Sequence, residues 1–212
     1  MARPPLRWIL VFLLAAAAGF GAYLLARPGT QPAEKAPPVP AEPVAAAPVI
    51  PERRPDVTLA DREGKMRSLS EWDGQPQVIN FWATWCAPCR REIPMLNQLA
   101  KDGDWPEIAL IGIAIDFRED VLEYLTRTPI DYTVLIGEQD GLDAARAFGM
   151  ASLGLPFTAF VDSAGRIVTI HLGELHRPQA DTILSVVREL DAGRIGLEAA
   201  KARIRAEVPK IS

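Results

Sequence analysis

The sequence of 212 residues predicts an α/β domain, with a central mixed β-sheet flanked by helices, that follows an N-terminal transmembrane helix. Apolar runs of strand length alternate with helical patterns between residues 56 and 191, which is typical of this fold class. The run at 108–115 is apolar without alternation, as in a central strand that is covered on both faces. The nineteen uncharged residues at 8–26 are enough to cross a bilayer as a helix.

Composition divides the chain into four parts. Residues 1–27 form a short cytoplasmic stub and the membrane anchor, and residues 28–55 form a linker rich in proline and alanine, which favours extended, semi-rigid conformations. Residues 56–191 form the α/β domain. The tail at 192–212 has a helical composition with a weak apolar stripe, and we expect it either to dock on the domain or to fray.

The anchor is expected to remain on the mature protein. Arg3 and Arg7 precede the apolar segment, and positive charge favours the cytoplasmic side of the membrane. A cleaved signal peptide is the alternative, but its apolar part runs about 7 to 15 residues and ends at a small-x-small site. Here the run is longer and ends in Leu24-Leu25-Ala26-Arg27-Pro28. We therefore expect a single-pass inner-membrane protein with its domain in the periplasm or another extracytoplasmic space.

The strands and helices of the domain are expected in a definite order. Strands are predicted at 57–60, 66–69, 78–82, 108–115, 133–136, 157–161 and 167–172, and helices at 87–100, 119–127, 142–148 and 177–190. Polar turns at 61–64 and 162–165 join the first two and the last two strands as hairpins. The predicted order places helices between the middle strands of the sheet.

Charge and cysteine content exclude several classes of function. The 27 acidic and 23 basic residues give a net charge of -4, so the chain has no basic surface for nucleic acid. The only cysteines are Cys86 and Cys89, too few for a structural zinc site, and His171 and His176 are interpreted as surface histidines. No metal and no cofactor are expected.

The two cysteines form the motif Cys86-Ala87-Pro88-Cys89 between a buried strand and a helix. A helix N-terminus presents unpaired N–H groups and partial positive charge, which stabilise a thiolate at Cys86, whereas Cys89 lies one turn further in. Residues three apart at a helix start have Cα atoms within the roughly 4.4 to 6.8 Å that a disulfide requires. We therefore expect a redox-active pair in which Cys86 attacks and Cys89 resolves.

The segment Asn80-Phe81-Trp82-Ala83-Thr84-Trp85-Cys86-Ala87-Pro88-Cys89 resembles the active site of the thioredoxin superfamily. Pro94 matches the proline that bends the helix after the motif, and Leu155-Pro156 resembles the cis-proline loop that faces the disulfide. The predicted anchor, the stretch at 69–72 and the insert at 116–136 resemble the membrane-tethered TlpA and ResA type of disulfide reductase. This resemblance implies a thioredoxin-like fold and substrate contacts at Trp85, Leu155 and Pro156. Trp82 and Trp85 are also expected to pack around the motif.

One position departs from ordinary thioredoxins. The buried aspartate that helps deprotonate the second cysteine is replaced by Asn80, which cannot accept a proton. Glu92 lies on the same helical face as Cys89 and matches the glutamate of the ResA group, so we expect it to handle protons, although it is also an acid favourable near a helix start. Arg90 and Arg91 are candidates for positive charge near the thiolates.

The resemblance implies a protein-disulfide reductase. Its substrates would be proteins with disulfides or thiols, such as apocytochrome c or copper-site cysteines. Electrons would come from a membrane protein of the DsbD or CcdA type, because a reductase in an oxidising compartment needs such a supply.

Three alternatives remain at this stage. The pair can serve a disulfide oxidant or isomerase, or it can bind Cu(I), to which soft thiolates are suited. A peroxidase of the peroxiredoxin type shares the fold but requires a Pro-x-x-x-Thr-x-x-Cys frame, and Thr84 stands one residue too close to Cys86.

Overall fold

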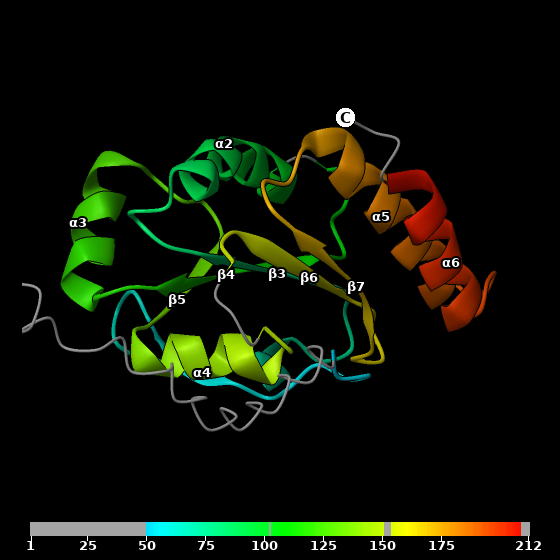
Figure 1. Cartoon of the computed structure of the whole chain (residues 1–212), viewed down its shortest axis with the longest axis horizontal. Helices are drawn as coiled ribbons and strands as arrows, with labels where there is room; N and C mark the ends of the chain where they lie inside the picture. Colours follow the sequence, from blue (N-terminus) through cyan, green and yellow to red (C-terminus); the bar gives the residue numbers. More distant parts are fainter. Residues whose placement is uncertain (1–49, 102, 151–153, 209–212) are drawn as a thin grey trace, which may run out of the picture. The chain divides into compact units, whose positions relative to one another are not determined.

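The computed structural model describes residues 50–101, 103–150 and 154–208, which form a seven-stranded mixed sheet with helices on both faces (Figure 1). The predicted thioredoxin-like α/β architecture is confirmed for this part of the chain. The strands are Thr58–Asp61 (β1), Met66–Ser68 (β2), Gln77–Trp82 (β3), Ala109–Ile115 (β4), Thr133–Gly137 (β5), Phe157–Val161 (β6) and Ile167–Leu172 (β7). The helices are a 3-10 turn at Leu69–Trp72 (η1), then Ala87–Lys101 (α2), Arg118–Arg127 (α3), Gln139–Ala147 (α4), Arg177–Asp191 (α5) and Leu197–Glu207 (α6).

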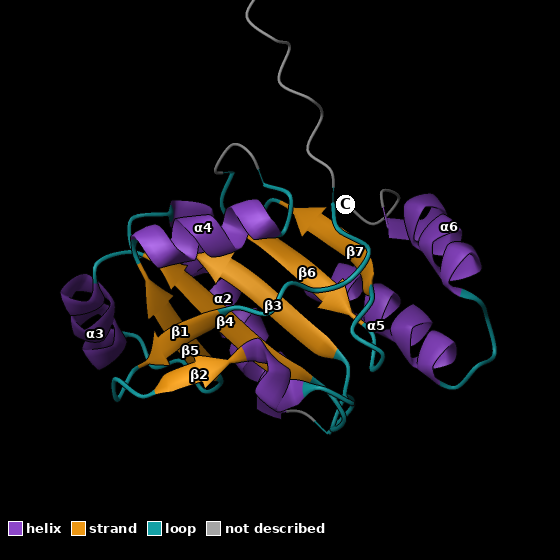
Figure 2. Ribbon diagram, turned by 90° about the horizontal axis from the view of Figure 1, so that it is seen from below, coloured by secondary structure: helices purple, strands orange, loops and turns teal. Residues whose placement is uncertain are grey.

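The strand order β2-β1-β5-β4-β3-β6-β7 places β3, which leads into the cysteines, near the middle of the sheet. β3, β4 and β5 run parallel, with Trp82 opposite Ala114, and all six residues of β3 are buried. β6 runs antiparallel to β3 with Phe157 opposite Phe81, and β7 follows antiparallel with Leu172 opposite Phe157. The ends of β3, β4 and β7 and the start of β6 therefore meet at one edge of the sheet, called here the cysteine edge (Figure 2).

Each face of the sheet has its own apolar core. On one face, Trp82 and Val78 of β3 pack with buried residues of α2, α3, α5 and α6. On the opposite face, Ile79 and Phe81 pack with α4, where Phe81 stacks on Phe157 with ring centroids 4.2 Å apart. The lack of alternation in β3 and β4 follows from this two-sided burial. The helices on either face are visible in Figure 1.

Most predicted boundaries lie within one residue of the observed ones, and two of the differences change how a segment is assigned. Leu69 does not continue β2 but begins η1, because the Ser68 hydroxyl accepts a backbone N–H while Glu71 accepts the N–H of Ser68, a capping box. α4 begins three residues before the predicted start at 142, so Gly141 lies inside the helix. A Cβ at Gly141 would lie 3.4 Å from Ile115 Cγ1, an ordinary van der Waals distance, so α4 packs directly against β4 at this residue.

The tail docks on the domain. Within α6, Ala200 and Ile204 are buried in the core that also contains Leu190 of α5. Of the two alternatives for the tail, residues 197–207 therefore dock on the domain and do not fray. The predicted anchor at 1–27 and most of the predicted linker lie outside the described residues. Within 50–101, 103–150 and 154–208, no helix is both long and apolar enough to cross a membrane.

Candidate active site

The cysteine motif occupies the turn between β3 and α2. Cys86 directly precedes the first residue of α2, its N–H donates to Ala83 O, and it forms a disulfide with Cys89. The Cα atoms are 5.3 Å apart, inside the range expected for residues three apart at a helix start. The predicted pairing of the two cysteines is confirmed.

The helix start distinguishes the two sulfur atoms. The Cys89 N–H donates to Cys86 Sγ over 3.3 Å, so a free N–H of the first turn points at the sulfur expected to carry the thiolate. Cys89 is fully buried, whereas Cys86 keeps 5% of its surface exposed. Both differences favour Cys86 as the nucleophile, although its exposure in the disulfide form is smaller than the sequence indicated.

Pro156 lies beside the motif. The Leu155-Pro156 peptide bond is cis, as predicted, and Pro156 directly precedes β6, whose Phe157 pairs with Phe81 of β3. This pairing brings residues 155 and 156 to the cysteine edge. Leu155 is partly buried and packs against both apolar cores.

Glu92, three residues after Cys89 on α2, forms the centre of a buried polar network. It is 1% exposed, and its Oε1 accepts a hydrogen bond from Asn80 Nδ2 over 2.8 Å. Its Oε2 accepts the Leu175 N–H, also over 2.8 Å, and Asn80 donates its second bond to Thr158 Oγ1 over 3.0 Å. The network joins α2, β3, β6 and the segment before α5, so Glu92 is more than an exposed acid at a helix start.

Burial raises the pKa of Glu92 from 4.5 to about 7, and the nearby charge of Glu174 acts in the same direction. The hydrogen bonds from Leu175 and Asn80 stabilise the carboxylate and oppose this rise in the pKa. A carboxyl group with a pKa near neutrality can both accept and release a proton at physiological pH.

A second buried carboxylate, Asp116, was not singled out from the sequence. It follows β4 at the cysteine edge and is 7% exposed. Its Oδ2 accepts the Thr84 N–H over 3.0 Å and the Thr84 hydroxyl over 2.6 Å, while Oδ1 accepts the Phe117 N–H over 2.9 Å. Asp116 therefore ties the loop that leads to Cys86 to the end of β4. An aspartate directly after a buried strand was the only signal in the sequence.

Three large apolar side chains are exposed around the cysteine edge. Trp85 is 62% exposed, Phe117 55% and Leu172 65%. The prediction that both tryptophans pack around the motif was right for Trp82, which is fully buried, and wrong for Trp85. Trp85 lies in the turn after β3, where its side chain is left largely to solvent. Exposed apolar surface of this kind is typical of a binding site for another protein.

The two candidate arginines do not both place their positive charge near the cysteine sulfur atoms. Arg91 forms an ion pair with Glu174, with Nη2 2.6 Å and Nε 2.8 Å from Oε2. Arg90 is exposed, and its side chain forms no hydrogen bond or ion pair with the described residues, although its backbone N–H donates to Cys86 O over 3.1 Å. The positive charge of Arg91, which was predicted to lie near the thiolates, is therefore paired with the carboxylate of Glu174.

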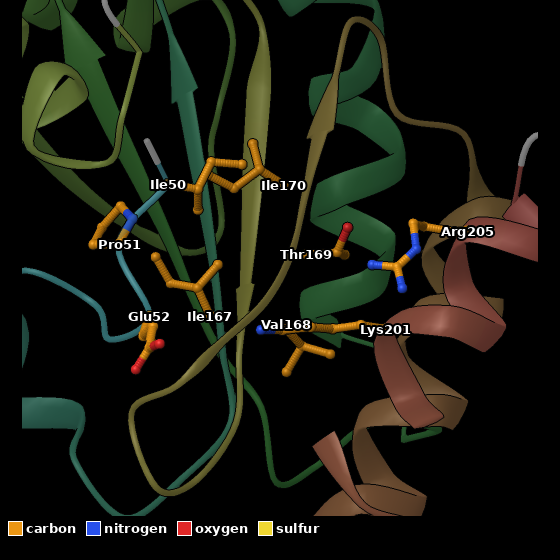
Figure 3. A pocket seen from close by; sticks show the side chains of 9 residues that line it. All are labelled: Ile50, Pro51, Glu52, Ile167, Val168, Thr169, Ile170, Lys201 and Arg205. Carbon is orange, nitrogen blue, oxygen red and sulfur yellow. The ribbon is translucent and has the colours of Figure 1, made fainter. Parts of the chain in front are cut away.

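One surface cavity, of about 320 Å³, lies away from the disulfide (Figure 3). Lys201 and Arg205 extend from α6 toward β7, and Ile50 lies near Ile170. The β7 residues that line it begin at Ile167, which pairs with Val161 at the end of the sheet opposite the cysteine edge. The cavity is therefore not part of the site built around the cysteines.

The fold and the site together define a class of protein. A disulfide between Cys86 and Cys89 at the start of a helix, with a cis-proline loop beside it, is the arrangement of a thioredoxin-like thiol-disulfide oxidoreductase. Residues 50–170 match the AhpC/TSA family, and the chain belongs to this family.

Relatives of known sequence agree with this class. The chain is 29% identical over 122 residues to the thiol-disulfide oxidoreductase ResA of Geobacillus thermodenitrificans, covering 57% of this chain and 68% of the relative. It is 27% identical over 139 residues to the thioredoxin-like protein YneN of Bacillus subtilis, covering 64% and 78%. The resemblance to the ResA type is confirmed.

Solved structures show the same fold. A thiol:disulfide interchange protein of the thioredoxin family from Chlorobium tepidum is 26% identical with a TM-score of 0.57, covering 66% of this chain and 97% of that one. The exposed lipoprotein thioredoxin Etrx1 of Streptococcus pneumoniae is 26% identical with a TM-score of 0.54, covering 64% and 100%. The protein is thus a TlpA/ResA-like thiol:disulfide oxidoreductase.

Proposed function

We propose that this oxidoreductase works as a reductase of disulfides in protein substrates on the extracytoplasmic side of the membrane. The observation that carries the proposal is the buried Glu92 carboxyl on the same helix as the Cys86–Cys89 pair, three residues after Cys89. Cys86 Sγ accepts an N–H of the helix start, and a buried carboxyl with a pKa of about 7 lies one turn beyond Cys89.

The reaction proceeds in two exchanges. In the reduced protein the Cys86 thiolate attacks one sulfur of the substrate disulfide, which forms a mixed disulfide and releases the first substrate thiolate. Cys89 then loses its proton and attacks Cys86 Sγ, which releases the second substrate thiolate and leaves the Cys86–Cys89 bond. Each substrate thiolate takes up a proton, and the substrate gains the two electrons that the cysteine pair loses.

Glu92 accepts the Cys89 proton in the second exchange. Cys89 is fully buried, and burial in apolar surroundings raises the pKa of a thiol, so its deprotonation requires a base inside the protein. Asn80 cannot serve, because an amide does not accept a proton at neutral pH. Asn80 instead orients Glu92 through a 2.8 Å hydrogen bond.

The substrate surface consists of Trp85 and the Leu155-Pro156 loop, with Phe117 and Leu172 beside them. The exposed apolar side chains support a protein substrate, because they offer contact area around a small reacting centre. By resemblance, candidate substrates are apocytochrome c and copper-site cysteines. A membrane protein of the DsbD or CcdA type would return electrons, and the apolar segment at 8–26 would hold the domain near it.

A Cu(I)-binding protein remains the second candidate. Two thiolates of one Cys-x-x-Cys motif suit this soft ion, and titration of the reduced protein with Cu(I) tests it directly. The structure adds one point against a peroxidase. Ala83 occupies the threonine position of that frame, and the Thr84 hydroxyl donates to Asp116.

The decisive experiment is the reduction potential of the Cys86–Cys89 pair, measured by equilibration with glutathione or dithiothreitol buffers, together with reduction of a protein disulfide. A potential near the roughly -270 mV of thioredoxin, with catalysed reduction, supports the reductase. A value near the roughly -120 mV of a strong oxidant, or the roughly -180 mV of an isomerase, would overturn the proposed direction.

A further inference from the structure

Three consecutive residues in the connection between β7 and α5 form hydrogen bonds or an ion pair with residues of the active site. The Gly173 N–H donates to Pro156 O over 2.9 Å, at the cis-proline loop. The Glu174 carboxylate bonds to the Arg91 guanidinium, and the Leu175 N–H donates to Glu92 Oε2 over 2.8 Å. We call residues 173–175 the clasp. Gly173 has φ +89, a conformation that other residues rarely adopt, which lets the chain turn back from β7 over α2.

The clasp brings opposite charges next to Glu92. Glu174 adjoins the residue whose N–H reaches the Glu92 carboxylate, and Arg91 precedes Glu92 on α2. The other groups that face Glu92 are the amide of Asn80, the hydroxyl of Thr158 behind it and the buried phenol of Tyr132. None of these carries a charge at neutral pH in the disulfide form. The Arg91–Glu174 pair is therefore the charged pair next to Glu92 among the described residues.

We propose that Arg91 and Glu174 are positioning residues of the exchange reaction, which hold the Leu175 amide against Glu92 and set the charge balance that this carboxylate experiences. This inference rests on the proposed proton-accepting role of Glu92. The pair acts through Glu92 and does not contact the sulfur atoms. The same clasp also bonds to the Pro156 loop through the Gly173 N–H. The predicted substrate loop and the predicted proton acceptor are therefore both held by hydrogen bonds from residues 173–175.

Single neutralisations of the pair should have opposite effects. Glu174→Gln keeps an oxygen that accepts both bonds from Arg91, so the clasp stays in place, but a negative charge is removed and the pKa of Glu92 falls. Arg91→Gln leaves the Glu174 charge uncompensated and weakens the hold on the Leu175 amide, and both changes raise the pKa of Glu92. Because the pair is partly exposed, each shift should be roughly 0.2 to 0.7 units.

The test is a titration of the Glu92 side chain in the full chain with the disulfide intact, followed by carbon-13 NMR of labelled glutamate carboxyl groups. The Glu92 signal is identified by its absence in Glu92→Gln. Arg90→Gln is the matched control, because it removes one positive charge at the neighbouring residue, whose side chain forms no bond to the described part of the protein. Opposite shifts in Glu174→Gln and Arg91→Gln, with little change in Arg90→Gln, support the clasp.

Shifts of the same sign in both variants, or shifts no larger than that of Arg90→Gln, would overturn the inference. A second measurement separates it from the proposed function. In the reduced full chain, the pH dependence of mixed-disulfide resolution should move in the same direction as the Glu92 titration in each variant. If Glu92→Gln leaves that pH profile unchanged while the NMR shifts remain opposite, the clasp tunes Glu92 but the proton-accepting role fails.

Discussion

The side-chain amide of Asn80 donates a 2.8 Å hydrogen bond to the Glu92 carboxylate and so joins β3 to α2 in the interior of the domain. The other N–H of the same amide donates to Thr158 of β6, so both amide hydrogens are engaged. An acid at position 80 would have placed a second titrating group in this buried network. The asparagine leaves Glu92 as the titrating residue of the network and orients its carboxylate.

Glu92 should make the stability of the folded protein depend on pH. Its folded pKa of about 7 lies above the ordinary 4.5, so the stabilisation is fully present below about pH 4.5 and is lost as the pH rises through 7. The difference corresponds to roughly 3 kcal/mol at most. Urea unfolding of the disulfide form between pH 4.5 and 8.5 measures it. In Glu92→Gln this part of the pH dependence should disappear, and an unchanged slope would contradict the raised pKa.

The two cysteines should behave differently when one is replaced by serine. Cys89→Ser keeps the attacking thiolate but removes the intramolecular displacement, so substrate proteins should accumulate as reducible adducts on Cys86. Cys86→Ser should form none. Non-reducing electrophoresis with and without dithiothreitol reads out the adducts. Better trapping by Cys86→Ser, or faster alkylation of Cys89 than of Cys86 in the reduced protein, would reverse the assignment.

Asp116 should support the loop before Cys86. Asp116→Ala leaves the Thr84 and Phe117 N–H groups without their acceptor, at a cost of about 0.5 to 1.5 kcal/mol for each of these partly buried hydrogen bonds. Thr84→Val removes only the hydroxyl bond and should cost less. Denaturant unfolding gives both values. Equal losses in the two variants would show that the backbone bonds to Asp116 contribute little.

Gly112 should not tolerate a side chain. A Cβ atom there would lie 2.9 Å from Tyr132 Cε2 and 3.1 Å from Trp82 Nε1, and both side chains are buried. Gly112→Ala should therefore destabilise the protein by about 1 to 3 kcal/mol through overpacking. Gly103→Ala is the control, because nothing lies within 4 Å of the Cβ at that position. Similar melting temperatures for the two variants would disprove the close contact.

Phe117 should contribute to the binding of protein substrates. Phe117→Ser should raise KM for a protein disulfide several-fold, since a buried aromatic contact contributes on the order of 1 kcal/mol or more, and should leave reduction of a small disulfide unchanged. Met66→Ser is the matched control, because Met66 is 58% exposed on β2, an edge strand far along the sheet from β3. Equal KM values for the two variants would remove Phe117 from the substrate surface.

The sequence alone determined the features that depend on neighbours along the chain. The apolar run before Cys86 predicted a buried strand, the motif spacing predicted the disulfide, and Leu155-Pro156 predicted the cis bond by resemblance. Helix 87–100 was placed within one residue of α2. These features are local, because the period of the apolar pattern and the spacing of two residues on a helix do not depend on the rest of the fold.

Only the tertiary structure decided which residues pack against each face of these helices and strands. Glu92 receives the Leu175 N–H from 83 positions away, and Asp116 reaches Thr84 across 32 positions. Trp85 and Trp82 are three residues apart and chemically alike, yet one is 62% exposed and the other fully buried. The physical reason is that burial and the pKa of a buried acid depend on which elements the topology brings together, and sequence periodicity assigns a residue to a face without naming its neighbours.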